Sequence, residues 1–223
     1  MLSLLFPPSC LLCGGPTRGL DILCEDCRSG LPGLSGPRCV RCQGLLDDPR
    51  TELCRACATS IGGFTSARAL GPYEGGWGKL IRALKFKGER SIAHFLSGRL
   101  AAYLEEEPFG RIDSITYVPM TGPDRRARGF NQAELLARGV GKRTSLPVYR
   151  TLRKVRRTPP QAGLSARERE KNLRGAFSLI KSGRGRILLV DDIYTTGATV
   201  QECSRSLRLG GYESVFVLTM ARA

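Results

Sequence analysis

The chain has 223 residues, which is enough for one medium α/β domain with a small appended module, but short for two domains with separate cores. It carries 35 Lys and Arg against 20 Asp and Glu, and the resulting net charge of +15 favours polyanionic partners such as nucleic acid or phosphorylated metabolites. The apolar opening MLSLLF lacks a basic flank and stops at Pro7, so it is too short for a secretory signal. No apolar run is long enough to span a membrane, and we expect a cytoplasmic protein.

Eight of the nine cysteines form four CxxC pairs, and the pairs repeat at an offset of 29 or 30 residues, which indicates an internal duplication. Two CxxC turns complete one tetrahedral four-thiolate site of the structural zinc kind. We therefore predict two structural Zn²⁺ ions in a module covering residues 1–62. Sequential pairing is the simplest arrangement, and a cross-braced arrangement is its rival. The predicted ligands are Cys10, Cys13, Cys24, Cys27, Cys39, Cys42, Cys54 and Cys57.

Residues 63–223 are predicted to form the second domain, in which strand and helix patterns alternate. Alternation of this kind is typical of an α/β fold with a mainly parallel twisted sheet and helices on both faces. The expected strands are 65–71, 112–119, 148–155, 176–180, 186–190 and 213–220. The expected helices are 79–104 with a candidate break at Gly88, 131–140, 165–173 capped by Ser165, and 197–209.

The segment after the apolar strand 186–190 is the main candidate for chemistry, because ligands of such sheets bind beyond the carboxyl ends of the strands. A glycine and three threonines there open onto a helix N-terminus, and backbone amides, hydroxyls and the helix dipole all attract a phosphate. The two carboxylates just before them would repel a phosphate but could accept hydrogen bonds from ribose hydroxyls. The residues are Asp191, Asp192, Thr195, Thr196, Gly197, Ala198 and Thr199.

An apolar strand that ends in two aspartates is also typical of the Walker B strand of a P-loop NTPase. That interpretation requires a GxxxxGK[ST] motif elsewhere in the chain. The sequence contains none, since Gly78-Lys79 and Gly141-Lys142 both lack the first glycine and the final Ser or Thr. We therefore favour the ribose-phosphate interpretation.

The segment VDDIYTTGATV, residues 190–200, is similar to the phosphoribosyl pyrophosphate signature of type I phosphoribosyltransferases. Together with the four CxxC pairs, the segments LKFKG, RGFNQAELLA, RTPPQAGLSAREREKNL and GAF resemble the ComF family of competence proteins. The resemblance implies a type I phosphoribosyltransferase fold behind a zinc finger, a role in natural transformation and DNA uptake, and binding of single-stranded DNA.

The resemblance also implies roles for individual residues. Asp191 and Asp192 would bind the ribose hydroxyls and Mg²⁺, and would be the catalytic pair of an active transferase. Residues 195–199 would bind the 5′-phosphate of phosphoribosyl pyrophosphate. The pyrophosphate side would be the loop after strand 115–119. That loop carries Thr121, Arg125, Arg126 and Arg128. Independently of the resemblance, residues 158–164 are a candidate lid, because basic residues flank them and they contain two consecutive prolines.

Basic residues are concentrated between positions 124 and 174, where the sequence contains fifteen Lys and Arg but four Asp and Glu. With Phe130 and Tyr149 as stacking platforms, this stretch predicts binding of single-stranded nucleic acid with weak sequence preference and steep salt dependence. The predicted contacts are Arg150, Arg153, Lys154, Arg156 and Arg157.

Three functions are compatible with the sequence. The first is a ComF-type protein that binds single-stranded DNA and carries a phosphoribosyl pyrophosphate site. The second is an active phosphoribosyltransferase of nucleotide or related metabolism, whose acceptor the sequence does not identify. The third is a non-catalytic zinc adapter that docks other transformation proteins.

Overall fold

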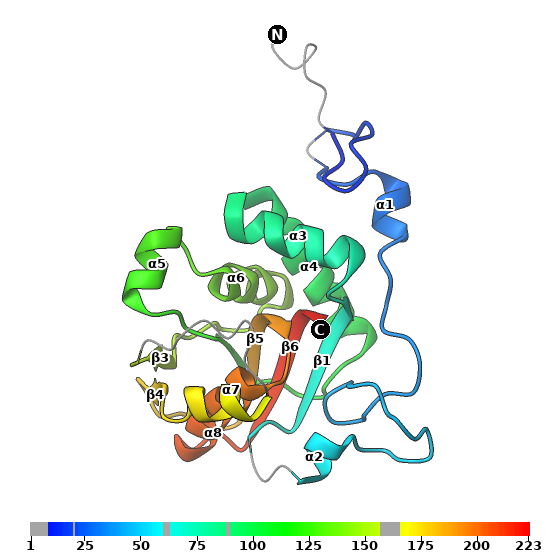
Figure 1. Cartoon of the computed structure of the whole chain (residues 1–223). Coiled ribbons are helices and arrows are strands. Elements are labelled where there is room, and N and C mark those ends of the chain that lie inside the picture. The colour runs from blue at the N-terminus through cyan, green and yellow to red at the C-terminus, as the bar shows by residue number, and fades with distance from the viewer. Residues whose placement is uncertain (1–8, 20, 60–62, 88–89, 157–165) are drawn as a thin grey trace.

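The computed structural model describes residues 9–19, 21–59, 63–87, 90–156 and 166–223 (Figure 1). Its centre is a four-stranded parallel sheet with the strand order β1-β6-β5-β2. These strands are β1 (Ser66–Pro72), β2 (Ser114–Tyr117), β5 (Arg186–Tyr194) and β6 (Ser214–Arg222). Each lies where the sequence predicts a strand.

Helices cover both faces of this sheet (Figure 1). One face packs against α3 (Gly75–Lys87), α4 (Arg90–Glu106) and α6 (Gln132–Thr144). The other face packs against α8 (Ala198–Leu209), which in turn contacts α7 (Ala166–Leu173). The predicted fold class, a mainly parallel sheet between two helical layers, is therefore confirmed.

Strand β5 is the central element of the core. Ile187, Leu188, Leu189 and Val190 are fully buried, as expected for a strand whose two faces are both covered by helices. The strand continues four residues beyond its predicted end at position 190. As a result Asp191 and Asp192 lie inside the strand, and only Thr195 to Gly197 form the turn before α8.

A short helix, α5 (Gly122–Arg128), replaces the loop that the sequence predicts after β2. The Thr121 side chain caps its N-terminus by accepting a hydrogen bond from the backbone N–H of Asp124, and a proline lies in its first turn. Gly129 ends the helix with a φ of 84°, in the left-handed region that glycine adopts easily. The prediction of a loop here was wrong because the helix-start pattern, the capping Thr121 followed by a proline, was not recognised.

The predicted strand 148–155 shrinks to β3 (Leu152–Lys154), which pairs antiparallel with β4 (Phe177–Leu179) outside the main sheet. The predicted helices 131–140, 165–173 and 197–209 correspond to α6, α7 and α8. The predicted helix 79–104 corresponds to α3 and α4, which lie on either side of residues 88–89. The opening MLSLLF, the domain boundary at Gly62, the lid candidate 158–164, Arg157 and the Ser165 cap lie outside the described residues.

The cysteine-rich segment contains two short helices, α1 (Glu25–Ser29) and α2 (Arg55–Thr59). Its second half packs along the free edge of β1, where Arg41 and Gln43 accept hydrogen bonds from the backbone N–H groups of Ala67 and Ala69, at 2.7 and 2.6 Å. An exposed strand edge invites pairing with other chains, so this contact protects the sheet.

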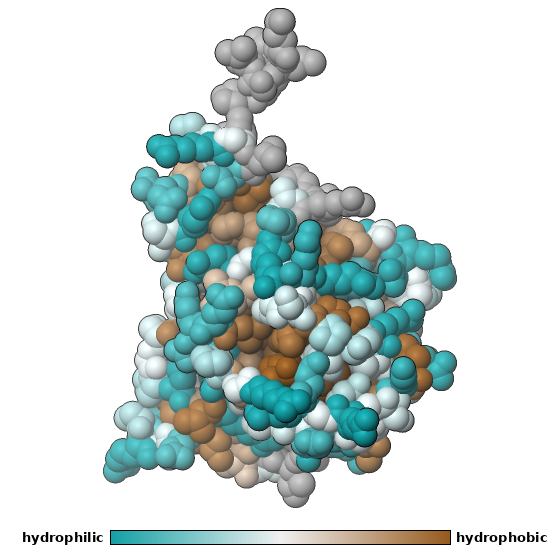
Figure 2. Space-filling view, turned by 180° about the vertical axis from the view of Figure 1, so that it is seen from behind, coloured by the Kyte–Doolittle hydropathy of each residue, from teal (hydrophilic) through white to brown (hydrophobic). Residues whose placement is uncertain are grey.

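The rear face of the molecule is largely hydrophilic, with apolar side chains reaching the surface in its middle (Figure 2). Among the residues that the structure describes, no helix combines the length and apolar character needed to cross a bilayer.

Candidate functional site

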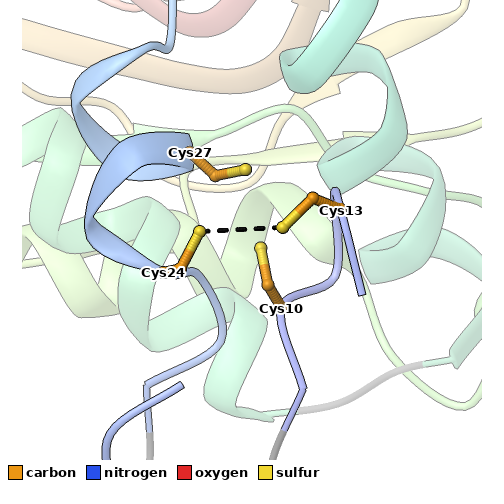
Figure 3. A group of neighbouring side chains, drawn as sticks. All are labelled: Cys10, Cys13, Cys24 and Cys27. Carbon is orange, nitrogen blue, oxygen red and sulfur yellow. Dashed lines mark hydrogen bonds between the residues drawn. The ribbon is translucent and has the colours of Figure 1, made fainter. Parts of the chain in front are cut away.

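The eight paired cysteines form two separate clusters, in each of which the ligand atoms lie within 4.8 Å of one another. Figure 3 shows the first cluster, in which Cys10 and Cys13 from one turn face Cys24 and Cys27 at α1. The second cluster combines the remaining four cysteines. The pairing is therefore sequential, and the cross-braced alternative is excluded.

The geometry of both clusters fits a tetrahedral zinc ion. The sulfur atoms of Cys13 and Cys24 are 3.7 Å apart, as are those of Cys42 and Cys54. Four sulfurs at about 2.3 Å from Zn²⁺ are separated by about 3.8 Å. Burial raises the pKa of Cys10, but backbone hydrogen bonds from Cys13, Cys24 and Leu12 outweigh it and lower the pKa to about 6. The same combination of causes brings the pKa of Cys39 to about 6. In the same clusters, hydrogen bonds with neighbouring thiols raise the pKa of Cys27 to about 12, and burial raises that of Cys57, so the sulfur geometry and not the pKa values supports zinc.

A second feature is a cavity of about 600 Å³ beyond the carboxyl end of β2, bordered by Lys85 of α3 and by Thr199 in the first turn of α8, which follows β5. This is the edge of a parallel sheet at which ligands of open α/β folds bind. Three cationic side chains and one carboxylate line it, over a partly apolar floor. The lining residues are Lys85, Phe86, Val118, Pro119, Met120, Asp124, Ala127, Arg128, Lys154, Phe177 and Thr199.

The two aspartates of β5 are adjacent and almost entirely buried, with 9% and 6% of their surfaces exposed. One Asp191 carboxylate oxygen accepts the backbone N–H of Asp192 at 2.9 Å. The Oδ2 atom of Asp192 lies 2.6 Å from the Lys85 ammonium and accepts a second hydrogen bond from the Gln132 amide at 3.3 Å. Arg128 in turn donates to the Gln132 carbonyl oxygen at 2.9 Å. A polar chain from Lys85 through Asp192 and Gln132 to Arg128 therefore runs along one side of the cavity.

Burial, and after it the charge of Asp192, raises the pKa of Asp191 well above its ordinary value of 3.8. A carboxyl group with a raised pKa holds its proton in the folded chain while the unfolded chain has released it, so its contribution to stability is lost as the pH rises from about 4. We expect Asp191→Asn to increase the free energy of unfolding at neutral pH, by a margin that shrinks towards pH 4. Urea unfolding at both pH values measures this margin, with the exposed Asp47→Asn as the control. If Asp191→Asn instead makes the protein less stable at neutral pH, Asp191 is ionised in the folded chain.

The side chain of Tyr194 packs against the turn between β5 and α8. Gly197 caps α8 with a φ of 81°, and its α-carbon packs directly against the Tyr194 ring and hydroxyl. The Arg222 guanidinium lies over this ring at 4.4 Å from the ring centre and donates to the Cys42 carbonyl oxygen at 2.7 Å. Contacts therefore run from the second cysteine cluster to the turn that holds Thr195 and Thr196.

The structure brings only some of the predicted site residues to the cavity. Thr199 and Arg128 line it, whereas Thr195 and Thr196 are exposed on the neighbouring turn. Thr121 is buried as the cap of α5, Arg125 pairs with Glu134 at 3.3 Å, and Arg126 is exposed away from the cavity lining. These last positions are fixed by α5, which the sequence interpretation missed.

The predicted nucleic-acid residues also divide into two groups. Lys154 lines the cavity, and burial lowers the pKa of its ammonium group. Arg150 and Arg153 are exposed, as is Tyr149, which precedes Arg150 in the chain, and the Arg153 guanidinium donates to the Ser178 hydroxyl. Arg156 donates to the backbone carbonyls of Asn172 and Arg174, so it supports the chain between α7 and β4.

Sequence reasoning missed the roles of Lys85, Phe86 and Gln132. Lys85 and Phe86 belong to the LKFKG segment, and Gln132 belongs to RGFNQAELLA. Both segments contributed to the family resemblance, but nothing in their local pattern indicates that α3 and α6 converge on the end of β5.

Comparisons with known proteins agree with these features. A protein family described as "double zinc ribbon domain" matches residues 1–58. Competence protein F of Haemophilus influenzae is 30% identical over 83% of this chain and 97% of its own length. Competence protein ComFC of Streptococcus pneumoniae is 28% identical over 96% of this chain and 99% of its own. DNA utilization protein YhgH of Escherichia coli K12 is 34% identical over 96% of this chain and 89% of its own length.

Two solved structures show a more distant similarity. The glutamine phosphoribosylpyrophosphate amidotransferase from B. subtilis has a TM-score of 0.42 and 18% identity, covering 72% of this chain and 32% of that one. An adenine phosphoribosyltransferase from Leishmania tarentolae has a TM-score of 0.40 and 11% identity, covering 63% of this chain and 74% of that one.

This chain covers relatives that are at least 30% identical to it over nearly their whole length. It also has two zinc-ribbon cysteine clusters and a strand that contains two aspartates and leads into a threonine-rich turn. The chain belongs to the ComF family of competence proteins.

Proposed function

We propose that this protein handles single-stranded DNA during DNA uptake and that its cavity binds phosphoribosyl pyrophosphate. The observation that carries the second part is the convergence of Lys85, Arg128 and Lys154 on a cavity bordered by the first turn of α8. Several cations around one cavity match a ligand with several phosphates, and helix N-termini favour phosphate as well.

The ribose hydroxyls would face the carboxylates of β5, and the 5′-phosphate would lie over the turn 195–199. Arg128 and Lys154 would then face the pyrophosphate. The relatives are named competence proteins and DNA utilization proteins, which supports the DNA-handling part of the proposal.

The family resemblance also implies Mg²⁺ at the two aspartates, and the chemistry of these residues decides whether they fit a metal. Carboxylate oxygens are suitable ligands for Mg²⁺, but they must be ionised and available. Asp192 Oδ2 already accepts from Lys85 and Gln132, and the raised pKa of Asp191 disfavours its charged form. The pair does not fit a protein-held Mg²⁺, and we assign no metal to it.

Calorimetric titration of phosphoribosyl pyrophosphate, in the presence of Mg²⁺ to allow every binding mode, tests the cavity. Arg128→Gln is expected to weaken binding by about tenfold or more, because it removes a charged hydrogen bond to phosphate. Arg126→Gln removes the same charge from the same helix, but outside the cavity lining, and is expected to leave binding unchanged. Wild-type protein that gives no binding signal would contradict the proposed site.

The DNA-binding surface is proposed to lie around Arg150 and Arg153, beside the half-exposed ring of Tyr149. Basic groups next to exposed aromatic rings follow a single strand by phosphate contacts and base stacking. Replacing both arginines with Ala is expected to weaken binding and to reduce the slope of log affinity against log salt by about 0.7 for each lost contact.

Fluorescence anisotropy with a labelled oligonucleotide over a salt series measures this slope. The control is the double replacement of Arg99 and Lys142 with Ala, which removes the same charge from exposed positions on α4 and α6. An equal loss in the control would mean that only the overall charge matters, and the proposed surface would then be wrong.

A further inference from the structure

We infer that Lys85 supplies the cation at the carboxylate pair, so that the cavity binds phosphoribosyl pyrophosphate without a divalent metal. This inference rests on the proposed function, because it concerns the same ligand. The juxtaposition that carries it is the contact between the last turns of α3 and the end of β5, where Lys85 lies 2.6 Å from Asp192.

Lys85 lies where a counter-ion for the Asp192 carboxylate would lie. Its side chain is 22% exposed, and it lines the cavity while its ammonium group holds Asp192 Oδ2. Gln132 donates to the same oxygen, and Arg128 orients Gln132 from the far side. The carboxylate therefore has a charged partner, a neutral donor and a fixed orientation.

The charge balance of the cavity points in the same direction. Lys85 offsets Asp192, and Arg128 and Lys154 add two further cations against the single carboxylate of Asp124 on the lining. A divalent ion at this place would be repelled by Lys85, whereas the oxygens of a pyrophosphate would be attracted by all three cations. Lys85 can contact a ligand oxygen and Asp192 together, because an ammonium group has three hydrogen-bond donors.

The test is calorimetric titration of phosphoribosyl pyrophosphate in two buffers, one with Mg²⁺ and one freed of divalent metals by a chelating resin before the protein is added. A soluble chelator is avoided because it would remove zinc from the ribbons. Wild-type affinity is expected to differ by less than about threefold between the two buffers.

Lys85→Met is expected to weaken metal-free binding by about tenfold to a hundredfold, the effect of losing one charged hydrogen bond. Mg²⁺ is expected to restore part of this loss, since Asp192 then lacks its counter-ion. Lys85→Arg keeps a cation and is expected to keep metal-free binding, which leaves the inference testable if the Met variant does not fold. Lys79→Met is the control, an exposed lysine on the same helix.

Each outcome separates the inference from the proposed function. Wild-type binding that requires Mg²⁺ would overturn the inference and leave the proposed site standing. Wild-type binding in neither buffer would overturn both. A Lys85→Met variant that binds as tightly as wild type without metal would overturn the role of Lys85 alone.

Discussion

Cys42→Ser is expected to remove one of the two zinc ions and to destabilise the whole chain, whereas Cys13→Ser should remove one zinc with a smaller effect on the α/β domain. The two cysteines occupy equivalent positions in the duplicated ribbons, and each accepts a backbone hydrogen bond from the glycine two residues later. They differ in burial, because Cys42 is buried and Cys13 is exposed.

The difference arises from what the second ribbon supports. Its Arg41 and Gln43 bind the edge of β1, the Gln43 amide donates to the Tyr103 hydroxyl at 3.1 Å, and the Cys42 carbonyl holds Arg222 of β6. A structural zinc contributes about 10–16 kcal/mol of binding free energy in isolated zinc fingers, so its loss should release these contacts.

Zinc content measured on the purified variants, together with thermal unfolding, distinguishes the two replacements. We expect each variant to retain one zinc, and only Cys42→Ser to lower the melting temperature of the α/β domain strongly. Phosphoribosyl pyrophosphate binding should also weaken in Cys42→Ser, because Arg222 lies over the Tyr194 ring, which packs against the turn 195–197 that is proposed to bind the phosphate. Equal melting temperatures for the two variants would mean that the second ribbon does not support the sheet.

Gly197→Ala is expected to abolish ligand binding in the cavity and to destabilise the chain. The added methyl group would lie 2.6 Å from a Tyr194 ring carbon and even nearer to the hydroxyl, so the turn or the ring must move. Overpacking of this kind costs about 1–3 kcal/mol, and a non-glycine residue at positive φ adds about 1–2 kcal/mol. Displacement of the turn would misplace the amides that are proposed to face the phosphate.

The matched control is Gly175→Ala. Gly175 also has a positive φ, 69°, but an added methyl group there would meet nothing within 4 Å. This variant should lose only the stability associated with backbone strain and should bind phosphoribosyl pyrophosphate as wild type does. If both alanine variants keep wild-type affinity, the packing of Tyr194 under Gly197 has no role in binding.

The fold class and the zinc ligands were predictable because each depends on local patterns. CxxC spacing defines a pair of thiolates, and continuous apolar runs such as residues 186–190 define buried parallel strands. The sequential zinc pairing needed the structure, since the spacing fits both arrangements. Helix α5 was missed because it is only seven residues long and rests on the cap formed by Thr121.

The cavity lining was less predictable, because it depends on where distant elements meet. Lys85 follows a helical pattern like any surface lysine, and its contact with Asp192 joins residues far apart in the sequence. Lys154 has the sequence neighbourhood of a nucleic-acid contact, yet the alternation along β3 exposes Arg153 and turns Lys154 to the cavity. Such choices are made by tertiary packing.

We propose that a phosphoribosyl ligand binds beyond the end of β5, at the first turn of α8. Hydrogen–deuterium exchange with and without phosphoribosyl pyrophosphate tests it most directly, because it reports which backbone amides are protected. We predict protection confined to the turn 195–199, the start of α8 and the segments around Lys85, Arg128 and Lys154. Calorimetric binding without protection of the turn 195–199 would contradict the proposed binding site.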